Sequence, residues 1–402
     1  MKNISGIAKA EEDLKYATRF VKPIMGMIGA WPISPSTSFF SKVLQRSKHI
    51  FTYFLFFLIM IPTLMYVFLK EKNNKMRLKL MPPIINCSIQ FFKYTIILWR
   101  RKEIQEGLYA IKHDWIKATE EERLIFRSKT KIGRRVVLIV AFTMYGGGLC
   151  YRMILPLLKG TIVTANNTTI RALPCPSYFL ILNEQQSPIY EILFVLQIIA
   201  GIAIYAVICG FCGIFALLVL HAWSMLRILV NKIKKLVDKS DMSEVVLQRK
   251  IMDIVEYQMK IRGEFLKNIE TITEYICLIE MIGSTCMICL VGYCILMEWE
   301  NTNTMAIVIY ITIQISIIFC VFILCYIGQM LVDENYIVSQ ASSTVNWYRL
   351  SIKNMRCLIL IIAMSNHPMK LKAAKMMEMS LITFTDIMKV SMGYLNILRE
   401  II

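Results

Sequence analysis

The chain has 402 residues, is 56% hydrophobic and carries a formal net charge of +18. Its apolar residues stand in blocks of 20 or more that are separated by charged stretches, which excludes a soluble globular protein and predicts an all-α, polytopic membrane protein. The Lys and Arg residues lie beside the apolar blocks and do not form one basic patch, so nucleic acid is not an expected partner.

Residues 1–48 precede the first apolar block and are polar and basic, with turns expected near Trp31-Pro32 and Pro35. They contain no apolar core followed by a small-residue cleavage site, so a cleaved signal peptide is not expected. The first apolar block then has to act as its own insertion signal. We interpret residues 1–48 as an N-terminal arm.

The apolar blocks predict seven transmembrane helices. The first six lie within residues 49–332, and the charged segments 100–135 and 221–270 are interpreted as long helical extensions outside the membrane. Residues 100–135 are expected to form one long helix. Three consecutive glycines, 146–148, would let a neighbouring helix approach the third span closely. The expected spans are 49–69, 80–99, 136–158, 188–220, 272–297, 305–332 and 378–402.

The sequence predicts no enzyme, metal site or cofactor. Most of the 12 cysteines lie in apolar blocks and are interpreted as small buried hydrophobic residues, and no cysteine pair is matched by histidines at metal spacing. A disulfide from Cys175 to Cys150 or Cys294 is left open. No HExxH, GxSxG or Walker loop is present, and no inverted repeat of hydropathy supports a transporter.

A few charged residues fall inside the expected spans. Glu191 lies near the start of the fourth span, and Glu280 lies within the fifth. Charges at such positions are costly in lipid and usually face protein or water. Arg152 and Lys389 are possible partners, but the sequence does not pair them.

The distribution of positive charge predicts the orientation. Residues 1–48 and the segments after the second, fourth and sixth spans hold 35 of the 46 Lys and Arg residues. The positive-inside rule therefore places the N-terminus in the cytoplasm and, after seven spans, the C-terminus outside the cell. The link after the first span conflicts with this orientation, because it carries Lys70, Lys72, Lys75, Arg77 and Lys79.

Two overlapping N-x-T sequons begin at Asn166 and Asn167, in the loop between the third and fourth spans. The orientation above places this loop outside the cell, where glycosylation occurs. We therefore expect Asn166 and Asn167 to be glycosylation sites.

The last part of the chain divides into two segments. Residues 333–377 contain a short apolar stretch and a break at Asn366-His367-Pro368, and we interpret them as a cytoplasmic segment. Residues 378–402 are long enough to cross a bilayer but carry many polar residues, which is typical of a helix that lines water or packs inside a bundle. These polar residues are Ser380, Thr383, Thr385, Asp386, Lys389, Ser391, Tyr394 and Asn396.

A series of short motifs runs from residue 328 to residue 399. They are Gly328-Gln329, Asp333-Glu334, Ser339, Trp347-Tyr348, Leu358–Met364 with Pro368, Ala373–Lys375, Met379–Leu381, Thr383-Phe384, Gly393-Tyr394 and Leu398-Arg399. In this combination the C-terminal third resembles the insect odorant receptor family, and the seven-span layout extends the resemblance over the whole chain. Two positions depart from the family pattern: Ser343 stands where the family usually has Tyr, and Met364 where it often has Arg.

The resemblance implies a subunit of a ligand-gated, nonselective cation channel. Four subunits would surround one pore, with this chain paired to the odorant receptor co-receptor and embedded in membrane lipid. The ligand would be a small volatile odorant, and the location the plasma membrane of an olfactory sensory neuron dendrite. Residues 333–377 would form a cytoplasmic anchor between subunits around Trp347 and Tyr348.

The resemblance also implies that residues 378–402 line the pore. Alignment on Tyr394 places Ile397 and Ile401 at the hydrophobic gate and Glu400 among the polar residues that face the pore. Apolar constrictions gate by dewetting, and a ring of carboxylates favours cations.

The odorant pocket, by the same resemblance, lies in the outer half of the bundle between the second, third, fourth and sixth spans. Aromatic and aliphatic walls with few polar groups suit small volatile molecules, because binding then comes mostly from buried apolar area and shape. The candidate ligand-binding residues are Tyr145, Tyr151, Tyr190, Phe194, Gln197 and Tyr310.

Two other receptor classes compete with this interpretation. A G-protein-coupled receptor has the opposite orientation, and the chain lacks both an Asp-Arg-Tyr after the third span and an NPxxY in the seventh. The sister gustatory receptors are expected to end in a TYxxxxQF motif, whereas this chain ends in GYLNILREII.

Overall fold

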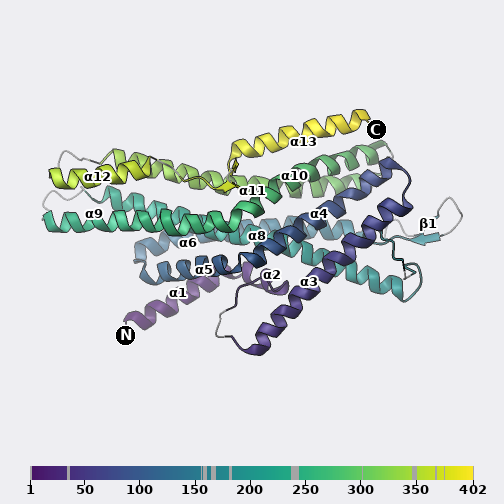
Figure 1. The fold of residues 1–402 in the computed structure, drawn as a ribbon, viewed down its shortest axis with the longest axis horizontal. Coiled ribbons are helices and arrows are strands. Elements are labelled where there is room, and N and C mark those ends of the chain that lie inside the picture. The colour runs from purple at the N-terminus through teal and green to yellow at the C-terminus, as the bar shows by residue number, and fades with distance from the viewer. Residues whose placement is uncertain are drawn as a thin grey trace.

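The chain folds into an elongated bundle of long helices (Figure 1). The computed structural model describes residues 2–33, 37–154, 156, 161–163, 169–180, 183–236, 244–300, 302–345, 351–366, 369–374 and 376–401. Within these residues the only strands form two short antiparallel ribbons, and the expected all-α class is confirmed. The ribbons pair β1 (Thr161–Val163) with β2 (Thr169–Arg171) and β3 (Lys372–Ala373) with β4 (Met377–Glu378).

Among the described residues, five helices are long and apolar enough to cross a membrane. They are α3 (Phe39–Met65) with the π-helical turn η1 (Tyr66–Lys70), α6 (Glu120–Leu149) with η2 (Cys150–Ile154), α8 (Ile189–Lys234), the continuous run of α9 (Glu244–Met259), η3 (Lys260–Leu266) and α10 (Lys267–Glu300), and α11 (Thr304–Ser343). The second and seventh expected spans correspond to α4 (Asn74–Trp99) and α13 (Leu381–Ile401), which are not among these five. The polytopic membrane class is confirmed.

Helix α8 is the centre of the bundle. It packs against α3, α6 and α11, and most of its side chains are buried. Its 46 residues span about 69 Å at 1.5 Å per residue, whereas the hydrocarbon core of a bilayer is about 30 Å thick. The helix therefore extends well beyond the membrane, as its length in the sequence predicts.

The N-terminal residues are packed helices rather than a free arm. Helix α1 (Lys2–Thr18) lies on α5 (Arg101–Lys117), and α2 (Val21–Met27) lies on α8. Two glycines of α8 make room for α2: a Cβ at Gly213 would lie 2.6 Å from Val21, and a Cβ at Gly210 would lie 2.9 Å from Met25. This docking adds an apolar contact that the polar composition of the segment conceals.

The expectation of one helix over 100–135 is wrong. The segment divides at Ala118-Thr119 into α5 and α6. The Thr119 side chain accepts a hydrogen bond from the Glu122 backbone N–H, while the Glu122 side chain accepts one from the Thr119 backbone N–H. This reciprocal capping box satisfies two backbone donors and begins a new helix there.

The two ends of the bundle differ in structure. At one end, α5, α9 and α12 (Ile352–Ser365) extend the bundle, and we call it the stalk end; β1 lies at the opposite end, which we call the hairpin end (Figure 1). Helix α13 runs along α10 and α11 on the outside of the bundle and finishes toward the hairpin end. The two termini therefore lie toward opposite ends, which fits an odd number of membrane crossings.

All 12 cysteines lie in the described residues and are free thiols, nine of them buried. Their interpretation as small buried hydrophobic residues is confirmed for these nine, and the disulfide left open at Cys175 does not form. Within the described part of the chain, no three His, Cys, Asp or Glu residues come together in a way that could hold a metal ion.

A buried polar cluster fastens three helical segments at the stalk end. Asp114 of α5 accepts a hydrogen bond from His221 of α8 at 3.1 Å, and its other oxygen pairs with Lys260 of η3. Burial raises the pKa of Asp114, but the hydrogen bonds and positive charge of His221 and Lys260 outweigh it, so the pKa is lowered overall. The charged carboxylate therefore stabilises this junction.

Replacing Asp114 by Asn removes this charge and should destabilise the fold by about 3 kcal/mol, because Lys260 loses its partner. Since folding lowers the pKa of Asp114, its contribution is present above the unfolded value of about 3.9 and disappears as the pH falls through the folded value. Thermal unfolding of both purified proteins should differ most above pH 5, and the difference should shrink as the pH falls below about 3.9. The exposed Asp253→Asn variant on α9 is the control, and an equal effect of both variants would contradict the prediction.

Candidate functional site

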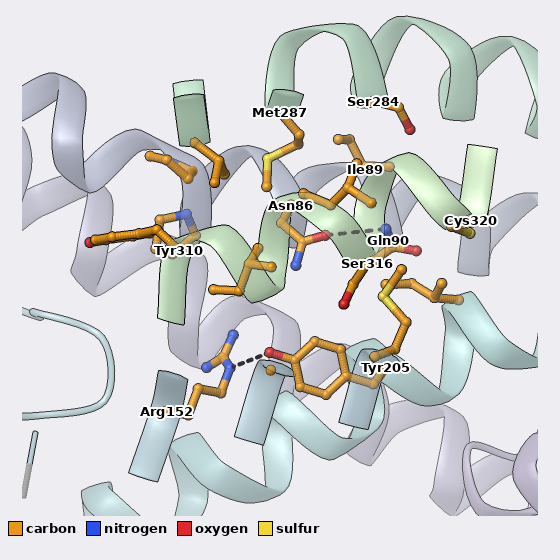
Figure 2. Close-up of a pocket in the computed structure, with 18 of the residues that line it drawn as sticks. Asn86, Ile89, Gln90, Arg152, Tyr205, Ser284, Met287, Tyr310, Ser316 and Cys320 are labelled. Atoms are coloured by element: carbon orange, nitrogen blue, oxygen red, sulfur yellow. Dashed lines mark hydrogen bonds between the residues drawn. The ribbon is translucent and has the colours of Figure 1, made fainter. Parts of the chain in front are cut away.

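A cavity of about 100 Å³ lies inside the bundle between α4, α6, α8, α10 and α11 (Figure 2). Four of these are the spans among which the sequence analysis expects a pocket, and α10 is the fifth. An apolar cavity of about 150 Å³ holds one benzene molecule, so this one suits a somewhat smaller molecule. Most of its wall is apolar, from Ile89, Met144, Ile208, Met287, Val291, Tyr310, Ile313 and Ile317.

Glycines of α6 give the cavity its shape. A Cβ at Gly148 would lie 2.1 Å from the Cζ atom of Tyr205, so only glycine leaves room for this ring, which lines the cavity. A Cβ at Gly147 would lie 3.2 Å from Thr312 of α11. The expectation that the glycine triplet permits close approach is therefore confirmed.

Two amide side chains of α4 line the cavity one helical turn apart. Gln90 Nε2 donates a hydrogen bond to Asn86 Oδ1 at 3.3 Å (Figure 2). Gln90 is only 3% exposed, and its Oε1 has no hydrogen-bond partner among the described residues. Ser316 also lines the cavity, and its hydroxyl lies 2.8 Å from the Thr312 carbonyl oxygen, to which it donates.

Arg152 of η2 lies at the cavity wall and is buried. Its Nε donates to Tyr205 Oη at 3.4 Å, and its Nη1 lies 3.4 Å from Cys175 Sγ and 3.5 Å from the Gln197 carbonyl oxygen. No Asp or Glu among the described residues forms an ion pair with it. The side of the cavity near Arg152 therefore carries a positive charge that is held only by neutral acceptors.

A buried ion pair lies toward the stalk end of the cavity. Lys93 Nζ of α4 is 2.5 Å from Glu280 Oε2 of α10, with Lys93 fully buried and Glu280 6% exposed. Cys320 Sγ lies 3.8 Å from the other Glu280 oxygen and 3.4 Å from Cys212 Sγ. Because Glu280 is neutralised by Lys93 and the lining residue Lys79 by Glu298, Arg152 carries the one lining charge without an opposite partner among the described residues.

The structure brings one of the six candidate ligand-binding residues to this cavity, Tyr310. Tyr145 packs edge-on against Tyr205 behind the wall, with ring centroids 5.8 Å apart. Gln197 is fully buried and holds the chain at 175–177 by hydrogen bonds to Cys175 and Ser177.

The remaining candidates lie toward the hairpin end. Tyr190 and Phe194 contact each other with centroids 6.0 Å apart, and Tyr190 Oη donates to the Ala172 carbonyl oxygen. The side chain of Tyr151 lies outside the described residues. Ligand contact by these six residues remains a prediction.

The other candidate residues do not line the cavity, or they lie outside the described residues. Ile397 and Glu400 lie on α13 and are exposed, Ile397 by 53%. The side chain of Ile401 lies outside the described residues, as do four whole residues: Trp347, Tyr348, Asn166 and Asn167.

Most residues that line the cavity were not predicted from the sequence. Asn86, Gln90 and Lys93 lie at helical spacing in α4, so all three share one face. Polar residues on one face of a membrane helix indicate a face that packs on protein or on a cavity, and this signal could have found them.

The fold and the cavity define a class: an all-α polytopic membrane protein with a small, mostly apolar chamber among its spans. The model of the 7tm odorant receptor family matches residues 73–392, which is most of the chain. The chain belongs to this family, as its C-terminal motifs predict. The family is one of receptors and not of enzymes.

Individual relatives and solved structures agree with this family. The chain is 26% identical to odorant receptor 85b of Drosophila melanogaster over 38% of each chain, and 21% identical to odorant receptor 30a of the same species over 58% of this chain and 60% of the relative. The matches thus span less than two thirds of these relatives. The insect olfactory receptor OR5 of Machilis hrabei in complex with eugenol has the same fold, with a TM-score of 0.79 at 12% identity over 97% of this chain and 100% of that one.

Replacing Gly148 by Ala should displace the Tyr205 ring and destabilise the protein by about 1–3 kcal/mol, the usual range for overpacking. Gly146→Ala on the same helix is the matched control, because nothing lies within 4 Å of its Cβ and Ala is the better helix former. Thermal unfolding of the purified proteins measures both. Equal unfolding temperatures for the two variants would show that the Tyr205 contact does not constrain the cavity.

Proposed function

We propose that this chain is the odorant-binding subunit of a nonselective cation channel, acting as a heterotetramer with the odorant receptor co-receptor. The observation that carries the proposal is the small, mostly apolar chamber enclosed by the spans of a chain of this family. Such a chamber binds volatile molecules by burying their apolar area. The dendritic plasma membrane of an olfactory sensory neuron is the proposed location.

The position of α13 supports a pore formed by several chains. One face of α13 packs on α10 and α11, while its other face is exposed on the outside of the bundle (Figure 1). The exposed apolar residues of this helix are Ile382, Val390, Met392, Tyr394 and Ile397. In the proposed tetramer this face meets the pore axis, with Ile397 and Ile401 forming the gate and Glu400 a carboxylate ring. Trp347 and Tyr348, in residues 333–377, provide the proposed anchor between subunits.

The proposed orientation keeps the stalk end in the cytoplasm and the hairpin end outside. The basic link after the first span argues against it, but one contact weakens this objection. Lys79 pairs with Glu298 at the end of α10, so part of the positive charge of the link is neutralised within the protein. A lysine that is paired with a carboxylate contributes less to the positive-inside bias that would retain the link in the cytoplasm.

The orientation can be measured by glycosylation. We expect the full chain with an N-terminal tag to lose mass on glycosidase treatment, and the double variant Asn166→Gln, Asn167→Gln to lose none. The tag should be inaccessible to antibody in intact cells. An accessible tag together with unglycosylated asparagines would reverse the orientation.

The channel can be measured by recording from cells that express this chain with the co-receptor. We expect cation currents evoked by small volatile molecules, which are absent without this chain. Glu400→Gln should lower the permeability of divalent relative to monovalent cations, because a carboxylate ring concentrates divalent cations. Glu378→Gln, which removes a carboxylate paired with Lys370 just before α13, should leave this ratio unchanged. Volatile-evoked signals that need a G protein and carry no current through the complex would overturn the proposal.

A further inference from the structure

The polar side chains that line the cavity limit which functional groups its ligand can carry. Gln90 is 3% exposed and lines the cavity, and its Oε1 accepts no hydrogen bond from the described residues. One N–H of its amide nitrogen donates to Asn86 Oδ1. A buried acceptor without a donor costs free energy, and a ligand that supplies the donor recovers it.

One free amide oxygen remains whichever way the oxygen and nitrogen atoms of Asn86 and Gln90 are assigned. Each amide offers one oxygen acceptor and one NH₂ donor group, and the contact between Asn86 and Gln90 uses one oxygen and one nitrogen. One amide oxygen of the pair is therefore left for an outside donor in either orientation. Ser316 does not supply it, because its hydroxyl is directed to backbone carbonyl oxygens of Thr312 and Thr143.

The charges around the cavity exclude a cationic donor. Glu280 is already paired with Lys93, and the Arg152 guanidinium faces the cavity without a carboxylate partner among the described residues. A protonated amine would meet this positive charge in a medium of low dielectric constant, where like charges repel strongly. The missing donor must therefore be neutral, and a hydroxyl group is the simplest one.

We propose that the cavity selects small neutral alcohols, with the ligand hydroxyl donating to Gln90 Oε1 and the alkyl chain packing against Ile89, Met287 and Tyr310. This inference rests on the proposed function, since it takes the cavity as the odorant site. The volume of about 100 Å³ is about two thirds of the roughly 150 Å³ cavity that holds benzene, so it suits an alcohol of about three or four carbons. Figure 2 shows the amide pair and these apolar side chains around the same space.

The test compares alcohols with isomeric ethers, which have the same atoms and a similar chain but no donor. The probes are 1-propanol against ethyl methyl ether, and 1-butanol against methyl propyl ether. The full chain is assayed with the co-receptor by current recording, and alone in purified form by thermal stabilisation. We expect each alcohol to act at a concentration about tenfold or more below that of its ether in both assays.

Variants of Gln90 should remove this preference. Gln90→Leu and the closer isostere Gln90→Met both delete the acceptor, and each is combined with Asn86→Leu, because Asn86 Oδ1 would otherwise lose its donor and become a new free acceptor at the cavity. In both double variants the alcohol-to-ether ratio should fall to about one while the ether response is kept or improved. The matched control is Gln258→Leu at the stalk end, which also replaces a buried glutamine whose Oε1 has no described partner but which lies far from this cavity. It should keep the wild-type ratio. Because Leu and Met differ in shape, the test can still be made if one of the two variants does not fold.

The outcomes separate this inference from the proposed function. Equal action of alcohol and ether on the wild type, or a preference that survives in both double variants, overturns the role of Gln90 even if volatile-evoked currents are present. Absence of stabilisation by either alcohol overturns it as well. Alcohol-selective stabilisation of the purified chain that depends on Gln90 but produces no current supports the site and overturns the channel.

Discussion

The buried ion pair between Lys93 and Glu280 is the contact on which the cavity depends. It joins α4 to α10 inside the bundle, where Lys93 is fully buried and Glu280 is 6% exposed. Removing one partner from such a pair leaves an uncompensated buried charge, which is strongly destabilising, so the two helices are fixed in register by electrostatics as well as packing. The cavity lies directly beside this pair, and its opposite wall carries Arg152. Two of the charges at the cavity, Lys93 and Glu280, neutralise each other. The charge of Arg152 has no such partner among the described residues, so the cavity has a net positive charge on the side of Arg152.

Helix α10 links the cavity to the outer helix α13. Its residues Ser284 and Met287 line the cavity, while its neighbouring face receives α13. There Ser391 Oγ donates to the Thr285 carbonyl oxygen at 3.3 Å, and a Cβ at Gly292 would lie 3.1 Å from Leu395. A ligand shifts a conformational equilibrium only by binding one state better than another. In the proposed channel, a shift of α10 is the shortest route by which cavity occupancy alters the packing of α13.

Helices marked by a local sequence pattern could be predicted. Contacts between residues far apart in the sequence could not. Apolar blocks predicted the spans, and the glycine triplet predicted a close approach at Gly148. The pairing of Lys93 with Glu280 joins residues 187 positions apart, and no pattern in one sequence specifies such a partner. The break before α6 was missed although its cause is local, because the capping box at Thr119 lies within a continuous run of helix-forming residues. The docked α2 was missed because its partners are glycines of the distant α8.

Helix α4 shows that polar residues in a membrane helix indicate which face packs on protein or on a cavity. Asn86, Gln90 and Lys93 make it a weak span by composition, yet all three point to one face and have inward roles there. Lipid can solvate none of these groups, so the bundle has to provide either partners or a chamber. It provides Glu280 for Lys93 and leaves one amide oxygen of the other two facing a cavity. The residues that weaken the helix as a span are therefore the ones that give the chamber its chemistry.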